Sequence, residues 1–122
     1  MNMTKQPFEA AGVSAAAGER ASTVLKLSFA GAALHMPLFA LNGAREGPTV
    51  VITAGIHGSE YVGIETAYRF ALETDPRELR GQVVVAPICS MNAFARRSIY
   101  LCPPDDKNLN RMFPGKADGS FA

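Results

Sequence analysis

The feature that most constrains the fold is an amphipathic helical pattern between two apolar runs. Residues 49–54 and 81–88 are apolar nearly throughout, which is typical of strands buried on both faces of a sheet. Between them, apolar side chains recur at helical spacing from residue 61, and the helix is expected to end near Glu73 because Pro76 follows. Strand, helix and strand together predict one βαβ unit with parallel strands and a right-handed crossover.

Upstream of this unit the sequence predicts a β-hairpin. Residues 23–29 alternate between apolar and polar side chains, which is the period of a half-buried strand. Residues 34–41 can form the second strand, although Pro37 restricts it to an edge or irregular strand. Together with the βαβ unit, this predicts an α/β fold with a mixed, mainly parallel sheet flanked by helices and an N-terminal hairpin at one edge of the sheet.

Length and composition indicate one globular domain. The chain has 122 residues and a net charge of +1, so it can bury a core but offers no electrostatic reason for a nucleic-acid or membrane-surface partner. Residues 1–21 are rich in Ala, Gly and Ser and are expected to form a flexible arm, with residues 22–122 as the domain. No stretch approaches the roughly 18 apolar residues of a membrane span, and we read no signal peptide. We therefore expect a cytoplasmic protein with Cys89 and Cys102 reduced.

A turn with metal-compatible side chains follows the first apolar run. Its sequence, AGIHGSE at residues 54–60, lies where ligands bind, beyond the carboxyl end of a parallel strand. His57 and Glu60 are both zinc-compatible, and less than one helical turn separates them, so both can reach one ion. Ser59 is the expected N-cap of the helix. The alternative is that His57 is a polar turn residue and Glu60 a favourable charge at the helix start.

Periodicity fails between residues 90 and 115, where arginines, asparagines, aspartates and prolines accumulate. Long irregular segments inside compact domains are usually functional, and this one can close over the metal-compatible turn. Its residues also have simpler interpretations. Arg97 and Arg111 could be solvated or paired with nearby aspartates. Asn108 and Asn110 could hold their own backbone in turns, which is the interpretation we favour for Asn108.

Two motifs occur in order along the chain. HGSE at residues 57–60 is followed by NLNRMFPG at residues 108–115, with Pro103 and Asp105 between them. This combination resembles the succinylglutamate desuccinylase and aspartoacylase family, a branch of the zinc carboxypeptidase-like fold, over residues 49–115. The resemblance implies a zinc-dependent amide hydrolase that releases an acyl group from an N-acyl amino acid or a related amine.

The resemblance also implies roles for five residues. His57 and Glu60 would be two ligands of Zn²⁺. Arg97 would be the catalytic arginine whose guanidinium stabilises the oxyanion. Asn110 and Arg111 would bind the carboxylate of the substrate, because an arginine fork matches a carboxylate bidentately.

Two family features have no counterpart in this chain, which ends at Ala122. They are a third zinc ligand, a histidine further along, and a catalytic glutamate; His35 precedes the motif and does not match. We therefore expect an N-terminal portion of a longer enzyme that self-associates or is only marginally stable. Two alternatives stay open: a metallocarboxypeptidase, or a truncated, non-catalytic module that binds a metal or another protein.

Overall fold

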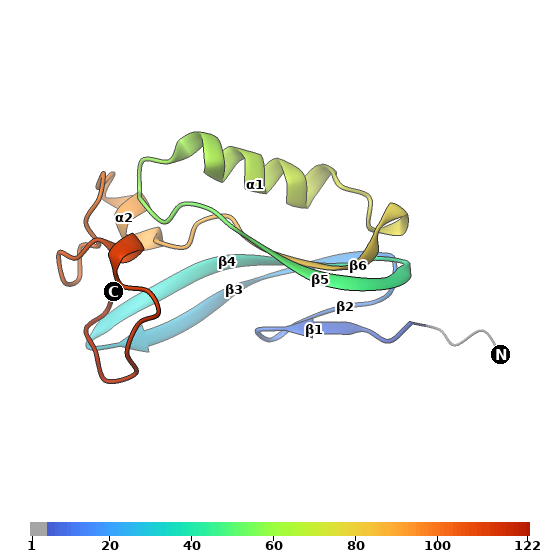
Figure 1. Ribbon diagram of the computed structural model, residues 1–122, viewed down its shortest axis with the longest axis horizontal. Helices are drawn as coiled ribbons and strands as arrows, with labels where there is room; N and C mark the ends of the chain where they lie inside the picture. The colour runs from blue at the N-terminus through green and yellow to red at the C-terminus, as the bar shows by residue number, and fades with distance from the viewer. Residues whose placement is uncertain (1–4) are drawn as a thin grey trace.

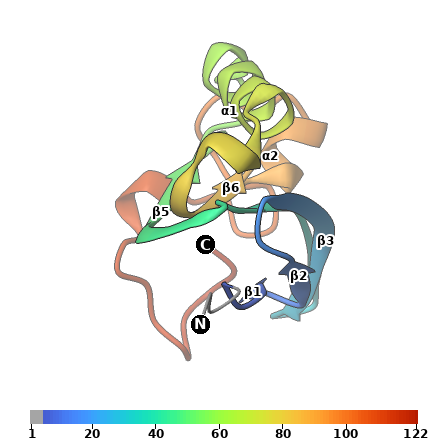
Figure 2. The same cartoon turned by 90° about the vertical axis from the view of Figure 1, so that its right-hand side faces the viewer.

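The computed structural model describes residues 5–122 as three layers (Figure 1). Helix α1 covers one face of a four-stranded sheet, and the small sheet formed by β1 and β2 lies against the other face (Figure 2). The elements in chain order are β1 (Phe8–Ala10), β2 (Val13–Ala15), β3 (Glu19–Phe29), β4 (Ala32–Asn42), β5 (Arg45–Thr53), α1 (Tyr61–Glu73), η1 (Pro76–Glu78), β6 (Arg80–Ala86), α2 (Met91–Ala95) and η2 (Leu109–Arg111).

The larger sheet is mixed, with the strand order β3-β4-β6-β5. Strands β5 and β6 are parallel and connected through α1, as the βαβ pattern predicts. The other two pairings, β3 with β4 and β4 with β6, are antiparallel. The prediction of a mainly parallel sheet is therefore wrong for residues 5–122, because the N-terminal hairpin inserts β4 directly beside β6.

The predicted hairpin is present, and both of its strands are longer than the predicted ranges 23–29 and 34–41. Strands β3 and β4 pair antiparallel from Glu19 opposite Asn42 to Phe29 opposite Ala32. Strand β3 lies at one edge of the sheet. Strand β4 tolerates Pro37 because its pairing with β6 is confined to residues 39–42, so no ladder hydrogen bond to β6 is required at the proline.

Strand β5 differs from its prediction as a central strand buried on both faces. It pairs only with β6 and forms the other edge of the sheet. Its apolar side chains are accordingly exposed, with Val51 at 63% and Val50 at 46% exposure. Strand β6 is an interior apolar strand, whose Val83 and Val85 are buried against α1 together with Leu41 of the neighbouring β4.

Helix α1 begins and ends close to the predicted bounds. It buries Ile64, Ala67 and Ala71, two of which pack with Leu41 and Val85 in the main core. The prediction of Ser59 as its N-cap is wrong. Glu60 is the N-cap residue and makes no side-chain capping bond, because its carboxylate is bonded to His57 instead.

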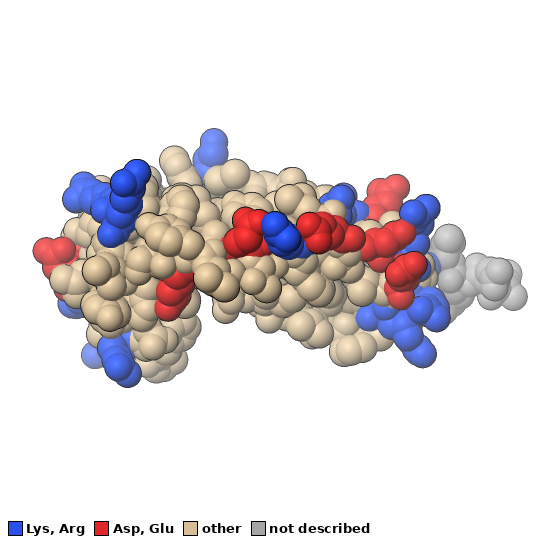
Figure 3. Space-filling view, turned by 90° about the horizontal axis from the view of Figure 1, so that it is seen from above, with Lys and Arg blue, Asp and Glu red and all other residues tan. Residues whose placement is uncertain are grey.

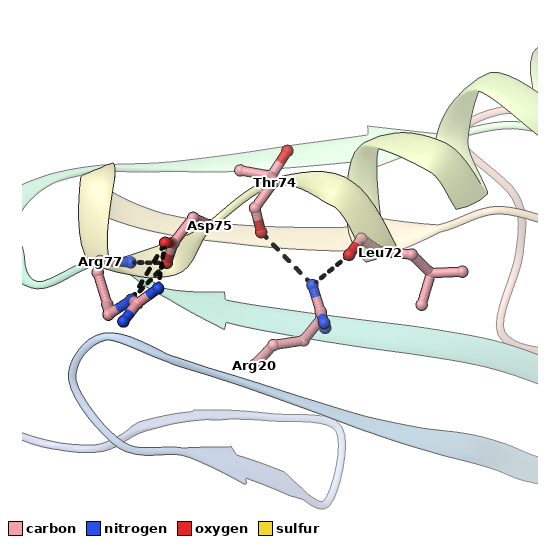
Figure 4. Close-up of polar contacts among 5 residues, drawn as sticks. All are labelled: Arg20, Leu72, Thr74, Asp75 and Arg77. Carbon is pink, nitrogen blue, oxygen red and sulfur yellow. Dashed lines mark hydrogen bonds and ion pairs between the residues drawn. The ribbon is translucent and has the colours of Figure 1, made fainter.

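The C-terminal end of α1 is capped from the hairpin. The Arg20 guanidinium on β3 donates hydrogen bonds to the carbonyls of Ala71 (2.9 Å), Leu72 (2.8 Å) and Thr74 (3.4 Å), as Figure 4 shows for the last two. These carbonyls have no partner within the helix, and a cation is favourable at this end of the helix dipole. Arg20 therefore ties the edge strand to the helix layer.

Within the stretch expected to be a flexible arm, the structure has β1 and β2. Lys5 donates to the carbonyls of Gly43 (2.8 Å) and Gly81 (3.1 Å), and the buried Asn42 amide donates to the Gln6 carbonyl (3.0 Å). These bonds connect the start of the described chain to the end of β4, the β4–β5 turn and the start of β6. Residues 1–4 lie outside the described residues.

The segment predicted to be irregular, residues 90–115, contains the short helices α2 and η2. Within residues 5–122, no helix is long and apolar enough to cross a membrane. Acidic and basic side chains are interspersed on the face that Figure 3 shows, with uncharged surface between them. This face of the molecule thus has no large area of a single charge sign.

Candidate functional site

The turn between β5 and α1 is held by hydrogen bonds from the segment that follows β6. Its backbone continues the strand pairing, since Cys89 N donates to the Ala54 carbonyl and Ser90 N to the Gly55 carbonyl, both at 2.9 Å. Gly55 has a positive φ of 62°, which favours glycine. At Gly58, a Cβ atom would overlap the carbonyl group of Ala93 in α2. The turn therefore has a fixed conformation that depends on close packing.

His57 and Glu60 are brought together by this turn. His57 Nδ1 lies 2.9 Å from Glu60 Oε1, and the backbone N–H of His57 donates to Glu60 Oε2 at 3.1 Å. The His57 side chain is 15% exposed and that of Glu60 47%. The carboxylate is thus held beside the imidazole nitrogen while remaining open to solvent.

Asn108 orients the imidazole from the other side. Its Oδ1 lies 2.9 Å from His57 Nε2 and also accepts a hydrogen bond from the backbone N–H of Asn110 at 3.1 Å. An atom that accepts from a backbone N–H is the amide oxygen, so Nε2 must be the protonated nitrogen in this contact. Nδ1 is therefore the nitrogen available to a metal, as in sites where a second bond selects the tautomer.

The pKa values of the pair shift in opposite directions. The hydrogen bond to Asn108 and then the Glu60 carboxylate raise the pKa of His57, against the opposing effects of burial and the Arg111 charge. The backbone N–H of His57 is the main cause that lowers the pKa of Glu60. Both shifts favour the protonated imidazole beside the ionised carboxylate, so a metal ion would compete with a proton for Nδ1.

The residues present fit a metal ion as two of its ligands. Two donors bound tetrahedrally to zinc lie about 3.3 Å apart, so the observed 2.9 Å between Nδ1 and Oε1 needs only a small opening. Among residues 5–122, no group of three or more His, Cys, Asp or Glu side chains could hold a metal. His35 lies on β4 opposite Lys26 in the hairpin.

The predicted substrate-binding pair lies in η2, next to the candidate metal ligands. Asn108 is the N-cap of this helix, as its interpretation as a turn residue predicts. Arg111 is exposed, and its charge is the smallest of the effects on the pKa of His57, opposing the net rise. Arg111 also lines a cavity of about 540 Å³ with Lys107 and Phe113 among its other walls. The Arg111 side chain is therefore open to a ligand in this cavity.

Arg97, the predicted catalytic arginine, lies just after α2 and makes no hydrogen bond to either candidate metal ligand in the part of the chain that the structure describes. It follows α2 with a positive φ of 54°, and its backbone N–H donates to the Phe94 carbonyl at 3.0 Å. Its side chain is exposed, and within the described residues no hydrogen bond to its guanidinium is present. The role of oxyanion donor implied by the resemblance is not supported by a contact with His57 or Glu60.

Sequence reasoning missed two residues that touch His57. Asn108 was interpreted as a turn residue, so its contact with His57 was not predicted. Its place at the start of the NLNR motif could have indicated a role in the site. Tyr100 packs edge-to-face against the imidazole, with ring centroids 5.6 Å apart, and no pattern in the sequence pointed to it. Asp105, which lies between the two motifs, accepts a hydrogen bond from the Ala122 backbone N–H at 2.8 Å.

Comparisons with known proteins agree on the family. Residues 46–122 match the succinylglutamate desuccinylase/aspartoacylase catalytic domain. An N-alpha-acetyl-L-2,4-diaminobutyric acid deacetylase from Halomonas elongata is 39% identical over 77 residues, which are 62% of this chain and 22% of that protein.

Two solved structures have a similar fold. A succinylglutamate desuccinylase/aspartoacylase from Rhodobacter sphaeroides is 31% identical, with a TM-score of 0.72 over 84% of this chain and 33% of its own. A product-bound ectoine utilization protein from Ruegeria pomeroyi is 27% identical, with a TM-score of 0.74 over 99% of this chain and 37% of its own. The chain thus spans about a fifth of the deacetylase and about a third of each solved structure.

Proposed function

Because the chain belongs to the succinylglutamate desuccinylase/aspartoacylase family, we propose that it carries half of the metal site of a zinc-dependent amide hydrolase. The observation that carries the proposal is the 2.9 Å approach of His57 Nδ1 to Glu60 Oε1, with Nε2 bonded to Asn108. This geometry places Nδ1 and a carboxylate oxygen side by side, where both could bind one metal ion once Nδ1 carries no proton. A third protein ligand and a general base are inferred to come from other segments of the full protein.

The proposed zinc ion would be held by His57 and Glu60. When bound, it supplies polarisation of the substrate carbonyl and lowers the pKa of a coordinated water from about 15.7 toward about 7. The protein's part is to orient the ligands, and the bond from Nε2 to Asn108 supports that role because outer contacts fix ring direction and raise ligand basicity.

We propose an N-acyl amino acid as the substrate class. Asn110 and Arg111 lie in η2, whose N-cap residue Asn108 contacts His57. A substrate whose carboxylate is bound by the Arg111 guanidinium would therefore have its neighbouring amide near His57 and Glu60. Acetylated diaminobutyric acid, in the name of the Halomonas relative, is a compound of this kind. Arg97 remains the proposed oxyanion donor by resemblance, a role worth about 2.7–4 kcal/mol in comparable enzymes.

The first test is zinc binding by the full-length protein, measured by calorimetry with a competing chelator. His57→Ala and Glu60→Ala should each greatly weaken binding, whereas Glu65→Ala should not, because that side chain is exposed on α1 and pairs with Arg69. Zinc binding that is unaffected by both site variants would refute the proposal.

The second test is kinetic and separates the alternatives. Release of acetate from N-acetyl amino acids, lost in the two site variants, supports a deacylase. Preferential cleavage of peptides at a free C-terminus would instead favour a metallocarboxypeptidase, which the same ligands and the Asn110–Arg111 pair could serve. Metal binding without either activity in the full protein would favour a non-catalytic module.

A further inference from the structure

An aromatic side chain lies against the candidate metal ligand in the structure. The rings of Tyr100 and His57 have centroids 5.6 Å apart and are nearly perpendicular, with an interplanar angle of 87°. This is the edge-to-face arrangement that aromatic rings prefer at 4.5–7 Å. The Tyr100 residue is otherwise 62% exposed. A large exposed aromatic residue whose ring meets the imidazole is unusual enough to need a role.

The loop holds Tyr100 toward His57 through contacts of its own. Ser98 Oγ donates to the Leu101 carbonyl at 2.6 Å, and Ser98 N donates to the Ala93 carbonyl at 2.9 Å. These bonds close the loop on both sides of Tyr100 and attach it to α2. The backbone around Tyr100 is therefore held by hydrogen bonds that do not depend on the contact between the two rings.

The imidazole needs a third support. Its two nitrogens are bonded to Glu60 and Asn108, and an imidazole donates and accepts hydrogen bonds in the plane of its ring. Such bonds direct the nitrogens but leave the ring free to tilt out of that plane. A nearly perpendicular ring with its centroid 5.6 Å away opposes the tilt, because the tilted imidazole would have to move toward it.

We propose that Tyr100 is a positioning residue for His57. The tyrosine ring keeps Nδ1 of His57 directed at the metal position beside Glu60. The inference rests on the proposed metal site and adds a residue to it. The contact belongs to the aromatic ring, so the phenol hydroxyl is not required for this role. Tyr100→Phe should therefore preserve the function, and Tyr100→Ala should lose it.

The experiment uses the full-length protein with Co²⁺ in place of zinc, because the visible absorption of Co²⁺ reports the geometry of its ligands. Tyr100→Ala is expected to weaken metal binding about three- to ten-fold and to change the Co²⁺ spectrum. Tyr100→Phe should match the wild type in both. Ile99→Ala is the matched control, because it truncates a side chain of similar exposure (58%) in the same loop.

A separate measurement tests the contact without metal. The ring protons of His57 should have ring-current-shifted NMR resonances in the metal-free protein, and Tyr100→Ala alone should abolish the shift. Wild-type affinity and spectrum in Tyr100→Ala would overturn the positioning role while leaving a His57-dependent metal site intact. A wild-type protein that binds no metal through His57 and Glu60 would overturn the proposed function, and this inference with it.

Discussion

Asn108 Oδ1 lies 2.9 Å from His57 Nε2, although 51 positions separate the two residues in the sequence. The same oxygen caps η2 through the Asn110 backbone N–H. One side chain thus links the helix that presents Asn110 and Arg111 to the histidine that we propose as a zinc ligand. Substrate recognition and metal binding would therefore share a structural element.

Replacing Asn108 should weaken metal binding. Asn108→Ala removes the acceptor of the Nε2 proton and is expected to lower zinc affinity about 10- to 100-fold, as is usual for outer-shell partners of ligating histidines. Asn108→Asp keeps an acceptor and should bind zinc far better than the alanine variant. Competition calorimetry measures both. Asn92→Ala, which removes a bond to the Ala33 carbonyl near the hairpin tip, should leave affinity unchanged; equal affinities in all three variants would contradict the linkage.

The His57–Glu60 pair should give the metal-free protein a pH-dependent stability. The pKa of His57 is raised from about 6.5, so its contribution is complete below that value and is lost as the pH rises through the folded pKa. The pKa of Glu60 is lowered from about 4.5, so its contribution is present above that value and is lost in acid. The difference in unfolding free energy between the wild type and His57→Gln should therefore be largest between about pH 4.5 and 6.5.

Urea unfolding at several pH values in the presence of a chelator measures this difference. Zinc affinity should change in the opposite sense and increase with pH, because the metal displaces the Nδ1 proton. A difference that grows steadily from pH 6 to pH 9 would be inconsistent with the raised pKa.

Arg20→Ala should destabilise the fold without touching the site. It leaves the carbonyls of Ala71 and Leu72 without their partner at the end of α1, and the expected cost is about 1–2 kcal/mol. Chemical unfolding followed by circular dichroism measures it. Arg69→Ala removes an exposed pair with Glu65 on the same helix and should cost clearly less. A larger loss for Arg69→Ala would show that the cap contributes little.

Gly58→Ala and Gly63→Ala should change stability in opposite directions. A Cβ at position 58 would overlap the Ala93 carbonyl, so the turn must shift at a cost of about 1–3 kcal/mol, with weaker zinc binding. Position 63 lies inside α1, where the nearest atom to a new Cβ is 4.0 Å away, and alanine should stabilise the helix by about 0.5–1 kcal/mol. Thermal unfolding and zinc titration test both, and an unperturbed Gly58→Ala would contradict the packing described for the turn.

The exposed edge strand β5 should promote self-association of the isolated 122-residue chain. Val51 is 63% exposed on a strand that pairs on one side only, and such edges are templates for pairing with another chain. Sedimentation velocity should detect oligomers that Val51→Lys reduces, whereas Val62→Lys, on the outer surface of α1 at 84% exposure, should not. A monomeric wild-type chain at high concentration would contradict this expectation.

The sequence by itself determined the βαβ unit, the hairpin and the pair of candidate ligands. The helical spacing located α1 within a residue or two, the alternation located the hairpin, and three intervening peptide bonds were enough to bring His57 to Glu60. These features depend on local geometry, which side-chain periodicity and short spacing encode directly. The family resemblance likewise rested on contiguous motifs.

Only the tertiary structure decided which distant segments meet. The approach of Asn108 and Tyr100 to His57 depends on how the segment after β6 folds back over the turn, and no periodicity specifies that path. The edge position of β5 depends on strand order, which the apolar run Thr49–Ala54 does not encode, because buried central strands and one-sided edge strands can share a sequence pattern. The antiparallel pairing of β4 with β6 was not predicted for the same reason: pairing is a property of the assembled sheet, and each strand's own sequence is compatible with both directions.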